Sequence, residues 1–100
     1  MTNKLKYFVG NWKMFGEFAS LKIINNISNF ISKHKRVYRA KVVLCVPSTL
    51  IYFFNQKVKK NNILLGSQNC HFEENFGSYT GSISSSMLKA AGSKYVILGH

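Results

Sequence analysis

Three polar side chains follow apolar stretches of the chain at points where they could act on an anionic substrate. Asn11 and Lys13 come after the β-prone run Tyr7–Gly10, and residues two apart project to the same side of an extended chain. His100 ends a second apolar run, 95–100. An amide, a fixed cation and an imidazole that meet at one mouth suit a substrate oxygen that gains negative charge during reaction. Each residue alone also fits an ordinary structural role. Whether the three form a site therefore depends on where the fold places them.

The spacing of apolar residues predicts the elements that position these side chains. Strands are expected at Tyr7–Gly10, 41–46, 63–66 and 95–100, and helices at 18–31, 49–58 and 84–91. The first helix has apolar residues at helical spacing: Leu21, Ile24, Ile27 and Ile31. Ser48 is expected to cap the second helix and Gly92 to end the third. This β-α-β-α-β-α-β order favours an α/β fold, because parallel strands need crossover connections.

The carboxyl ends of parallel strands meet at one edge of the sheet, where such folds carry their chemistry. Asn11, Lys13 and His100 are therefore expected at one mouth. A polar stretch, 67–82, follows the third strand, and loops of that length in compact domains are usually functional or disordered. Neither of the common glycine-rich nucleotide-binding motifs occurs, so a nucleotide site has no support.

Composition limits the classes of function. The 100 residues are 46% hydrophobic and predict one globular unit, residues 1–100. The formal charge of +11 can attract nucleic acid, anionic membranes or phosphorylated substrates. The dense basic clusters Lys33–Lys41 and Lys57–Lys60 fall in connecting segments, however, and we interpret them as solvated linkers and not as binding patches. No apolar run is long enough to span a bilayer and no secretory signal is present, which favours a cytoplasmic protein. Cys45 and Cys70 are expected to be reduced thiols, and no metal or cofactor is expected.

Three motifs, taken in order, resemble the triosephosphate isomerase family. They are FVGNWKM at the first strand end, QNCHFEENFGSYTGSIS after the third strand and YVILGH in the fourth, and the resemblance runs from Tyr7 to His100. It implies a (β/α)8 TIM barrel of which this chain supplies the first half. It also implies an isomerase of glycolysis and gluconeogenesis that interconverts dihydroxyacetone phosphate and glyceraldehyde 3-phosphate through an enediolate, without a cofactor.

The resemblance assigns roles to single residues. Lys13 matches the family's active-site lysine, Asn11 its substrate-binding amide, and His100 the histidine that polarises the substrate carbonyl and is kept neutral in this family. Thr80 and Gly81 match the end of a loop that enters the partner's active site, so a homodimer is implied. Ser82 stands where the family usually has glutamate, so an intersubunit ion pair is expected to be absent.

One part of the family's machinery has no match in these residues. A closed barrel needs eight strands and about 250 residues, and none of Glu17, Glu73 and Glu74 matches the catalytic base. We therefore expect a truncated record of a longer product that is inactive and prone to self-association when isolated. Two other classes remain open: a basic nucleic-acid-binding module, suggested by the charge and Tyr38, and a non-catalytic half-barrel interaction protein.

Overall fold

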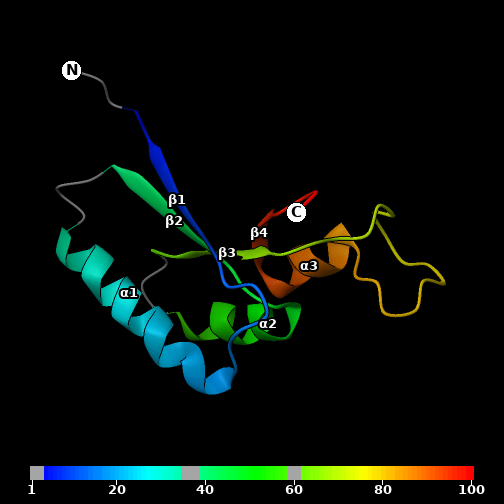
Figure 1. The fold of residues 1–100 in the computed structure, drawn as a ribbon, viewed down its shortest axis with the longest axis horizontal. Coiled ribbons are helices and arrows are strands. Elements are labelled where there is room, and N and C mark those ends of the chain that lie inside the picture. Colours follow the sequence, from blue (N-terminus) through cyan, green and yellow to red (C-terminus); the bar gives the residue numbers. More distant parts are fainter. Residues whose placement is uncertain (1–3, 35–38, 59–61) are drawn as a thin grey trace.

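The computed structural model describes residues 4–34, 39–58 and 62–100. Its elements, in chain order, are β1 (Lys6–Asn11), the 3-10 helix η1 (Phe18–Ser20), α1 (Leu21–His34), β2 (Ala40–Cys45), α2 (Ser48–Lys57), β3 (Leu64–Ser67), α3 (Ser85–Ala91) and β4 (Ser93–Val96). The strands form one parallel sheet in the order β1-β2-β3-β4. Figure 1 shows the helices beside the sheet and the segment between β3 and α3 extending away from it. The predicted alternating α/β fold is confirmed.

The core lies between the sheet and the helices, and β2 runs through its centre. Val43, Leu44, Cys45 and Val46 are all buried, as expected for a strand covered on both faces. The outward side of the sheet packs against α1, α2 and α3 through a cluster that comprises Ile24, Leu44, Val46, Leu50, Ile51, Phe54, Ile63, Leu65 and Leu88. The carboxyl half of β2 and the residues of β3 after Leu64 are therefore the most deeply buried parts of the sheet.

The sheet is strongly curled. Tyr7 of β1 and Tyr95 of β4 form an edge-to-face pair with ring centroids 6.2 Å apart, although two strands separate them. Neighbouring strands lie about 4.8 Å apart, so in a flat sheet these two strands would be separated by about 14 Å. The absence of a side chain at Gly66 allows β3 to approach its neighbours closely, since an added Cβ would lie 2.7 Å from the Cys45 Sγ atom and 3.2 Å from the Tyr95 carbonyl oxygen. Curvature of this kind is what a barrel wall requires.

Most expected element ends are shifted by one to three residues, and the expected cap of the second helix and the expected end of the fourth strand are wrong. Ser48 is the first residue of α2 and not its cap: Pro47 occupies the N-cap position, and its carbonyl accepts the Leu50 N–H at 2.9 Å. The run 95–100 was expected to be a strand, yet β4 ends at Val96 because its neighbour β3 ends at Ser67. The predicted end at Gly92 is confirmed, since this residue caps α3 in the left-handed conformation, with φ of 109°.

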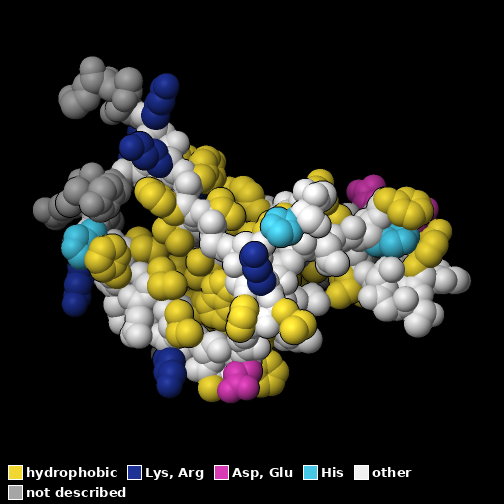
Figure 2. Space-filling model, viewed as in Figure 1, with side chains coloured by type: hydrophobic (Ala, Val, Ile, Leu, Met, Phe, Trp, Pro, Cys, Tyr) yellow, Lys and Arg dark blue, Asp and Glu magenta, His cyan; other side chains and the backbone are white. Residues whose placement is uncertain are grey.

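Part of the predicted basic clusters lies outside the described residues, namely residues 35–38, which include Tyr38, and residues 59 and 60. On the face shown in Figure 2, two lysine or arginine side chains lie close together at the upper left and the others are scattered, so they do not form one patch. Within the described ranges, no helix is long and apolar enough to cross a bilayer.

A candidate active site at the carboxyl edge of the sheet

The chain turns sharply where β1 ends. Asn11 is the last residue of β1 and pairs with Cys45 of β2. Its Oδ1 atom accepts the Lys13 backbone N–H at 2.9 Å, and Lys13 has a φ of 56°. Lys13 is the only non-glycine residue with a positive φ in the part of the chain described here. The alternating side-chain directions of an extended strand therefore do not continue to Lys13, because the Asn11 side chain holds the backbone in a turn.

Gln68 joins three strand ends at this edge. It directly follows β3, and its Nε2 amide donates to the Lys13 carbonyl at 2.7 Å and to the Cys45 carbonyl at 3.2 Å. A longer contact of 3.4 Å reaches Asn11 Oδ1. Two amide hydrogens thus serve three acceptors, so the longest contact is the weakest. Gln68 was not singled out from the sequence, and the signal that could have found it is its place directly after a buried strand.

Trp12 anchors the same turn from the opposite side. Its backbone N–H donates to the Cys45 carbonyl at 2.9 Å, and its ring packs edge-to-face on Phe54, with centroids 5.8 Å apart. Gly16, with φ of 110°, passes so close that an added Cβ would lie 2.9 Å from the Trp12 ring. The large apolar ring thus fixes the backbone into the core while Lys13 remains exposed. This explains an indole between two polar residues.

His100 lies at the same edge of the sheet but outside this network. It follows β4 by four residues, and parallel strands place that position on the carboxyl side with Asn11 and Lys13. Its side chain is exposed. Among the described residues, no hydrogen bond or ring contact joins His100 to either of the other two. The structure therefore brings Asn11, Lys13 and Gln68 into contact and leaves His100 as a separate group on the same side.

The segment between β3 and α3 closes on itself by local contacts. The His71 N–H donates to the Ile83 carbonyl at 2.9 Å, and the His71 ring lies 4.3 Å from the Tyr79 ring, measured between centroids. Thr80 and Gly81 occupy the exposed turn that follows, where Gly81 has a φ of 84°. The aromatic rings of Phe72 and Phe76 are 83% and 85% exposed. These exposed rings give the segment an apolar outer surface.

The electrostatics of the edge are simple. Burial raises the pKa of the Cys45 thiol, so this sulfur stays protonated beneath the turn. In the described ranges, no group of three histidine, cysteine or acidic side chains is placed to hold a metal ion. The exposed Lys13 ammonium is the positive charge that this turn presents to solvent.

Comparison with known proteins agrees with the sequence resemblance. A family model described as triosephosphate isomerase matches residues 6–100. The triosephosphate isomerase of Bartonella henselae is 45% identical over 95 residues, which cover 94% of this chain and 36% of the relative, and that of Wolbachia pipientis wMel is 45% identical over 96 residues.

The solved structures give the same result. The crystal structure of triosephosphate isomerase from Bartonella henselae superimposes on this chain with a TM-score of 0.84 at 43% identity. The superposition covers 95% of this chain and 38% of the Bartonella chain. The present chain thus spans little more than a third of the length of the relatives it matches. Fold, motif order and sequence identity agree, and the chain belongs to the triosephosphate isomerase family.

Proposed function

We propose that these residues supply one part of a triosephosphate isomerase active site, with Asn11, Lys13 and His100 acting on a small phosphorylated triose. The observation that carries the proposal is the fixed, exposed cation at the carboxyl edge: Lys13 is held at positive φ by Asn11 and Gln68. A non-glycine residue in that conformation costs about 1–3 kcal/mol and is found preferentially at functional sites.

Each side chain has a distinct task in this reaction. The Lys13 ammonium offsets the charge of the phosphate and of the enediolate oxygen, and Asn11 holds the Lys13 backbone in place. His100 donates a hydrogen bond to the substrate carbonyl, which makes the neighbouring C–H more acidic. Removal of that proton needs a positioned base, and none of Glu17, Glu73 and Glu74 matches the catalytic base of the family. The proton acceptor is therefore assigned to a part of the barrel beyond these residues.

The proposal extends to the organisation of the protein. Residues 1–100 form the first half of a single TIM-barrel domain in the cytoplasm, and the barrel acts as a homodimer. The exposed turn at Thr80 and Gly81, with the exposed rings of Phe72 and Phe76 behind it, is the surface that meets the partner. Ser82 donates its N–H to the Tyr79 carbonyl at 3.1 Å and so helps to shape that turn.

A chimera tests the catalytic proposal. The 100 residues are fused to the part of the Bartonella henselae enzyme that follows the similar segment, and isomerase activity is measured by a coupled assay. We expect turnover by the chimera and none by the 100-residue chain. Lys13→Met in the chimera is expected to lower kcat/KM by about 100-fold or more, a typical effect of removing one preorganised electrostatic group.

The matched control is Lys22→Met, which removes an exposed lysine from α1. It is expected to leave kcat/KM within about twofold, since surface substitutions away from a site have small effects. Turnover by the 100-residue chain alone, or equal rates for the two lysine variants, would contradict the proposal.

A further inference from the structure

Lys13 and His100 lie after strands that are not neighbours in the sheet. Lys13 follows β1 and His100 follows β4, the first and last strands in the sheet order. In the described ranges, no hydrogen bond or ring contact joins the two side chains. Both are assigned to one small substrate, so their relative position has to be set by the groups between them.

The Gln68 carboxamide holds the Lys13 end of this gap. Its Nε2 atom donates to the Lys13 carbonyl at 2.7 Å and to the Cys45 carbonyl at 3.2 Å. The first distance is at the short end of the range for N–H···O hydrogen bonds. Because the two shorter contacts of this amide both go to backbone carbonyls, the side chain ties the turn after β1 to the end of β2.

The backbone next to Gln68 is held from the other side. The Ser67 carbonyl accepts the Ile97 N–H at 3.0 Å, and Ile97 directly follows β4. A path of hydrogen bonds and covalent bonds therefore runs from Lys13 through Gln68 to Ile97. His100 lies three residues further along the same segment.

The Lys13 backbone needs this restraint. Its φ of 56° is a conformation that residues other than glycine rarely adopt. Its N–H donates to Asn11 Oδ1 at 2.9 Å, and its carbonyl accepts from Gln68. Two different side chains thus hold the two polar groups of this residue. Without Gln68 the carbonyl is free to turn toward a less strained conformation, and a misplacement of about 1 Å can cost about 100-fold in rate.

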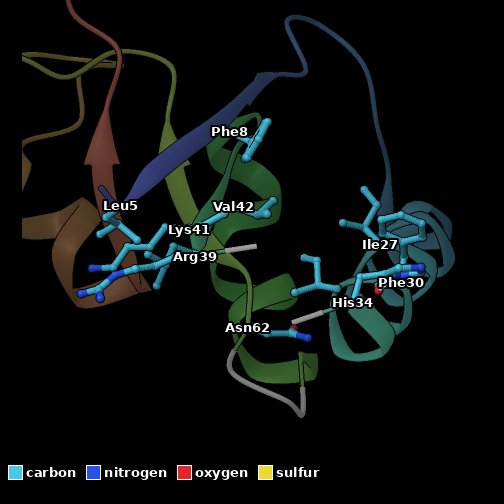
Figure 3. A pocket seen from close by; sticks show the side chains of 12 residues that line it. Leu5, Phe8, Ile27, Phe30, His34, Arg39, Lys41, Val42 and Asn62 are labelled. Atoms are coloured by element: carbon cyan, nitrogen blue, oxygen red, sulfur yellow. Dashed lines mark hydrogen bonds between the residues drawn. The ribbon is translucent and has the colours of Figure 1, made fainter. Parts of the chain in front are cut away.

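A hollow at the opposite edge of the sheet does not contribute to this arrangement. A groove with a volume of about 900 Å³ lies between α1 and the amino-terminal parts of the strands. Figure 3 shows Phe8 and Val42 on the strand side facing Ile27 across it, and Phe30 also lines it. Neither Gln68 nor any of the three candidate site residues is among its lining residues. The groups that can position Lys13 are therefore those at the carboxyl edge.

We propose that Gln68 is a positioning residue for the isomerase reaction: it fixes the Lys13 backbone relative to the strand end that leads to His100, so that the cation and the imidazole reach the same substrate. This inference rests on the function proposed above. Gln68 acts through Lys13 and needs no contact with the substrate, because its amide hydrogens are occupied by carbonyls. The effect of losing it is therefore expected in the properties that Lys13 controls.

The chimera tests this role. Gln68→Met keeps the length of the side chain but removes the donor. It is expected to raise KM about threefold and to lower kcat about threefold, because the Lys13 charge acts on the phosphate of the bound substrate and on the enediolate of the transition state. The inhibition constant of inorganic phosphate, a competing anion, is expected to rise with KM. Gln56→Met, exposed on α2, is the matched control and is expected to leave all three constants within about 1.5-fold.

A double variant separates positioning from folding. In the Lys13→Met chimera, Gln68→Met is expected to change kcat/KM less than about twofold, because the group that it positions is absent. A purely structural role would reduce the fraction of folded enzyme, which lowers kcat, leaves KM unchanged and adds to the effect of Lys13→Met. Circular dichroism verifies that the variants are folded to the same extent.

The 100-residue chain provides a readout that does not depend on turnover. Lys13→Gly is expected to raise the urea midpoint of the parent chain, because glycine relieves the strained conformation. In Gln68→Met the same substitution is expected to give no more than about half of that gain, because the turn relaxes once the Lys13 carbonyl is released.

The outcomes separate this inference from the catalytic proposal. An inactive chimera whose 100-residue chain still shows the coupling between Gln68 and Lys13 supports the link in the turn and counts against the proposed function. The inference would be overturned by unchanged KM and phosphate inhibition in an active Gln68→Met chimera, by additive losses in the double variant, or by equal gains from Lys13→Gly in the two chains.

Discussion

The two edges of the sheet are completed to different degrees. At the carboxyl edge, Gln68 ties β1, β2 and β3 together through carbonyl acceptors, and Trp12 packs into the core. At the amino edge, Phe8 and Phe30 remain more than half exposed around an open groove. TIM barrels use the carboxyl edge for chemistry, whereas the amino edge serves stability. The difference indicates that the turn at Lys13 is held by contacts among the described strand ends, whereas the amino edge leaves large apolar rings in contact with solvent.

Removing one ring from each edge gives the largest test of this difference. Phe54→Ala takes away a fully buried ring that supports Trp12 and is expected to lower the free energy of unfolding by about 3–5 kcal/mol. Phe30→Ala is expected to cost about 1 kcal/mol or less, because that ring is already largely in water. Urea denaturation followed by circular dichroism measures both. Equal losses would mean that the groove ring is as well packed as the core ring.

The hydrogen bonds of Gln68 give the next largest effect. Gln68→Met keeps the length of the side chain but removes the donor to Lys13 and Cys45, and it is expected to cost about 1 kcal/mol. Gln56→Met on α2 is the control, since that side chain is exposed and the change is expected to lie within about 0.5 kcal/mol. Matched denaturation curves compare the two. A loss of stability no larger than that of the control would show that the Gln68 hydrogen bonds do not stabilise the turn.

The conformation of Lys13 predicts a gain in stability, whereas the substitutions above are expected to lower it. Lys13→Gly is expected to raise the free energy of unfolding by up to about 1 kcal/mol, because glycine adopts positive φ without steric cost. The same substitution at Lys22, in the first turn of α1, is expected to lower it by up to about 1 kcal/mol. In the chimera, Lys13→Gly is also expected to abolish turnover. A stability loss at both positions would show that the turn is not strained.

The smallest expected effect concerns the buried thiol. Burial raises the pKa of Cys45, so the folded protein keeps its proton at a pH where the unfolded chain has released it. Stability is therefore expected to fall as pH rises past the ordinary thiol value of about 8.5, and Cys45→Ala is expected to flatten that decline. The decline is measured from the denaturation midpoints of the parent chain and of Cys45→Ala between pH 7 and pH 10. A steeper decline in the variant would contradict the assignment.

Local patterns predicted the fold well, because each strand and helix is determined by its own apolar spacing. The end of β4 was not predictable in this way: residues 97–100 continue an apolar run, but β3 offers no partner beyond Ser67, and the last bond is from the Ile97 N–H to the Ser67 carbonyl. The start of α2 shifted because Pro47 provides the first helical carbonyl, which leaves Ser48 inside the helix.

The candidate site was predictable in residue type but not in detail. Asn11, Lys13 and His100 follow from their positions at strand ends and from the family resemblance. The bridging role of Gln68 arises from a contact between residues 55 positions apart in the sequence, so no local pattern contains it. The positive φ of Lys13 accompanies a hydrogen bond to Asn11 two residues away, which the apolar spacing does not indicate.

The contact between Tyr7 and Tyr95 has a consequence for assembly. Because these rings from the first and last strands meet over the concave face, the sheet holds its bend without help from any other strand. The cost of bending the sheet is then offset in part by an attractive contact between its own two edge strands.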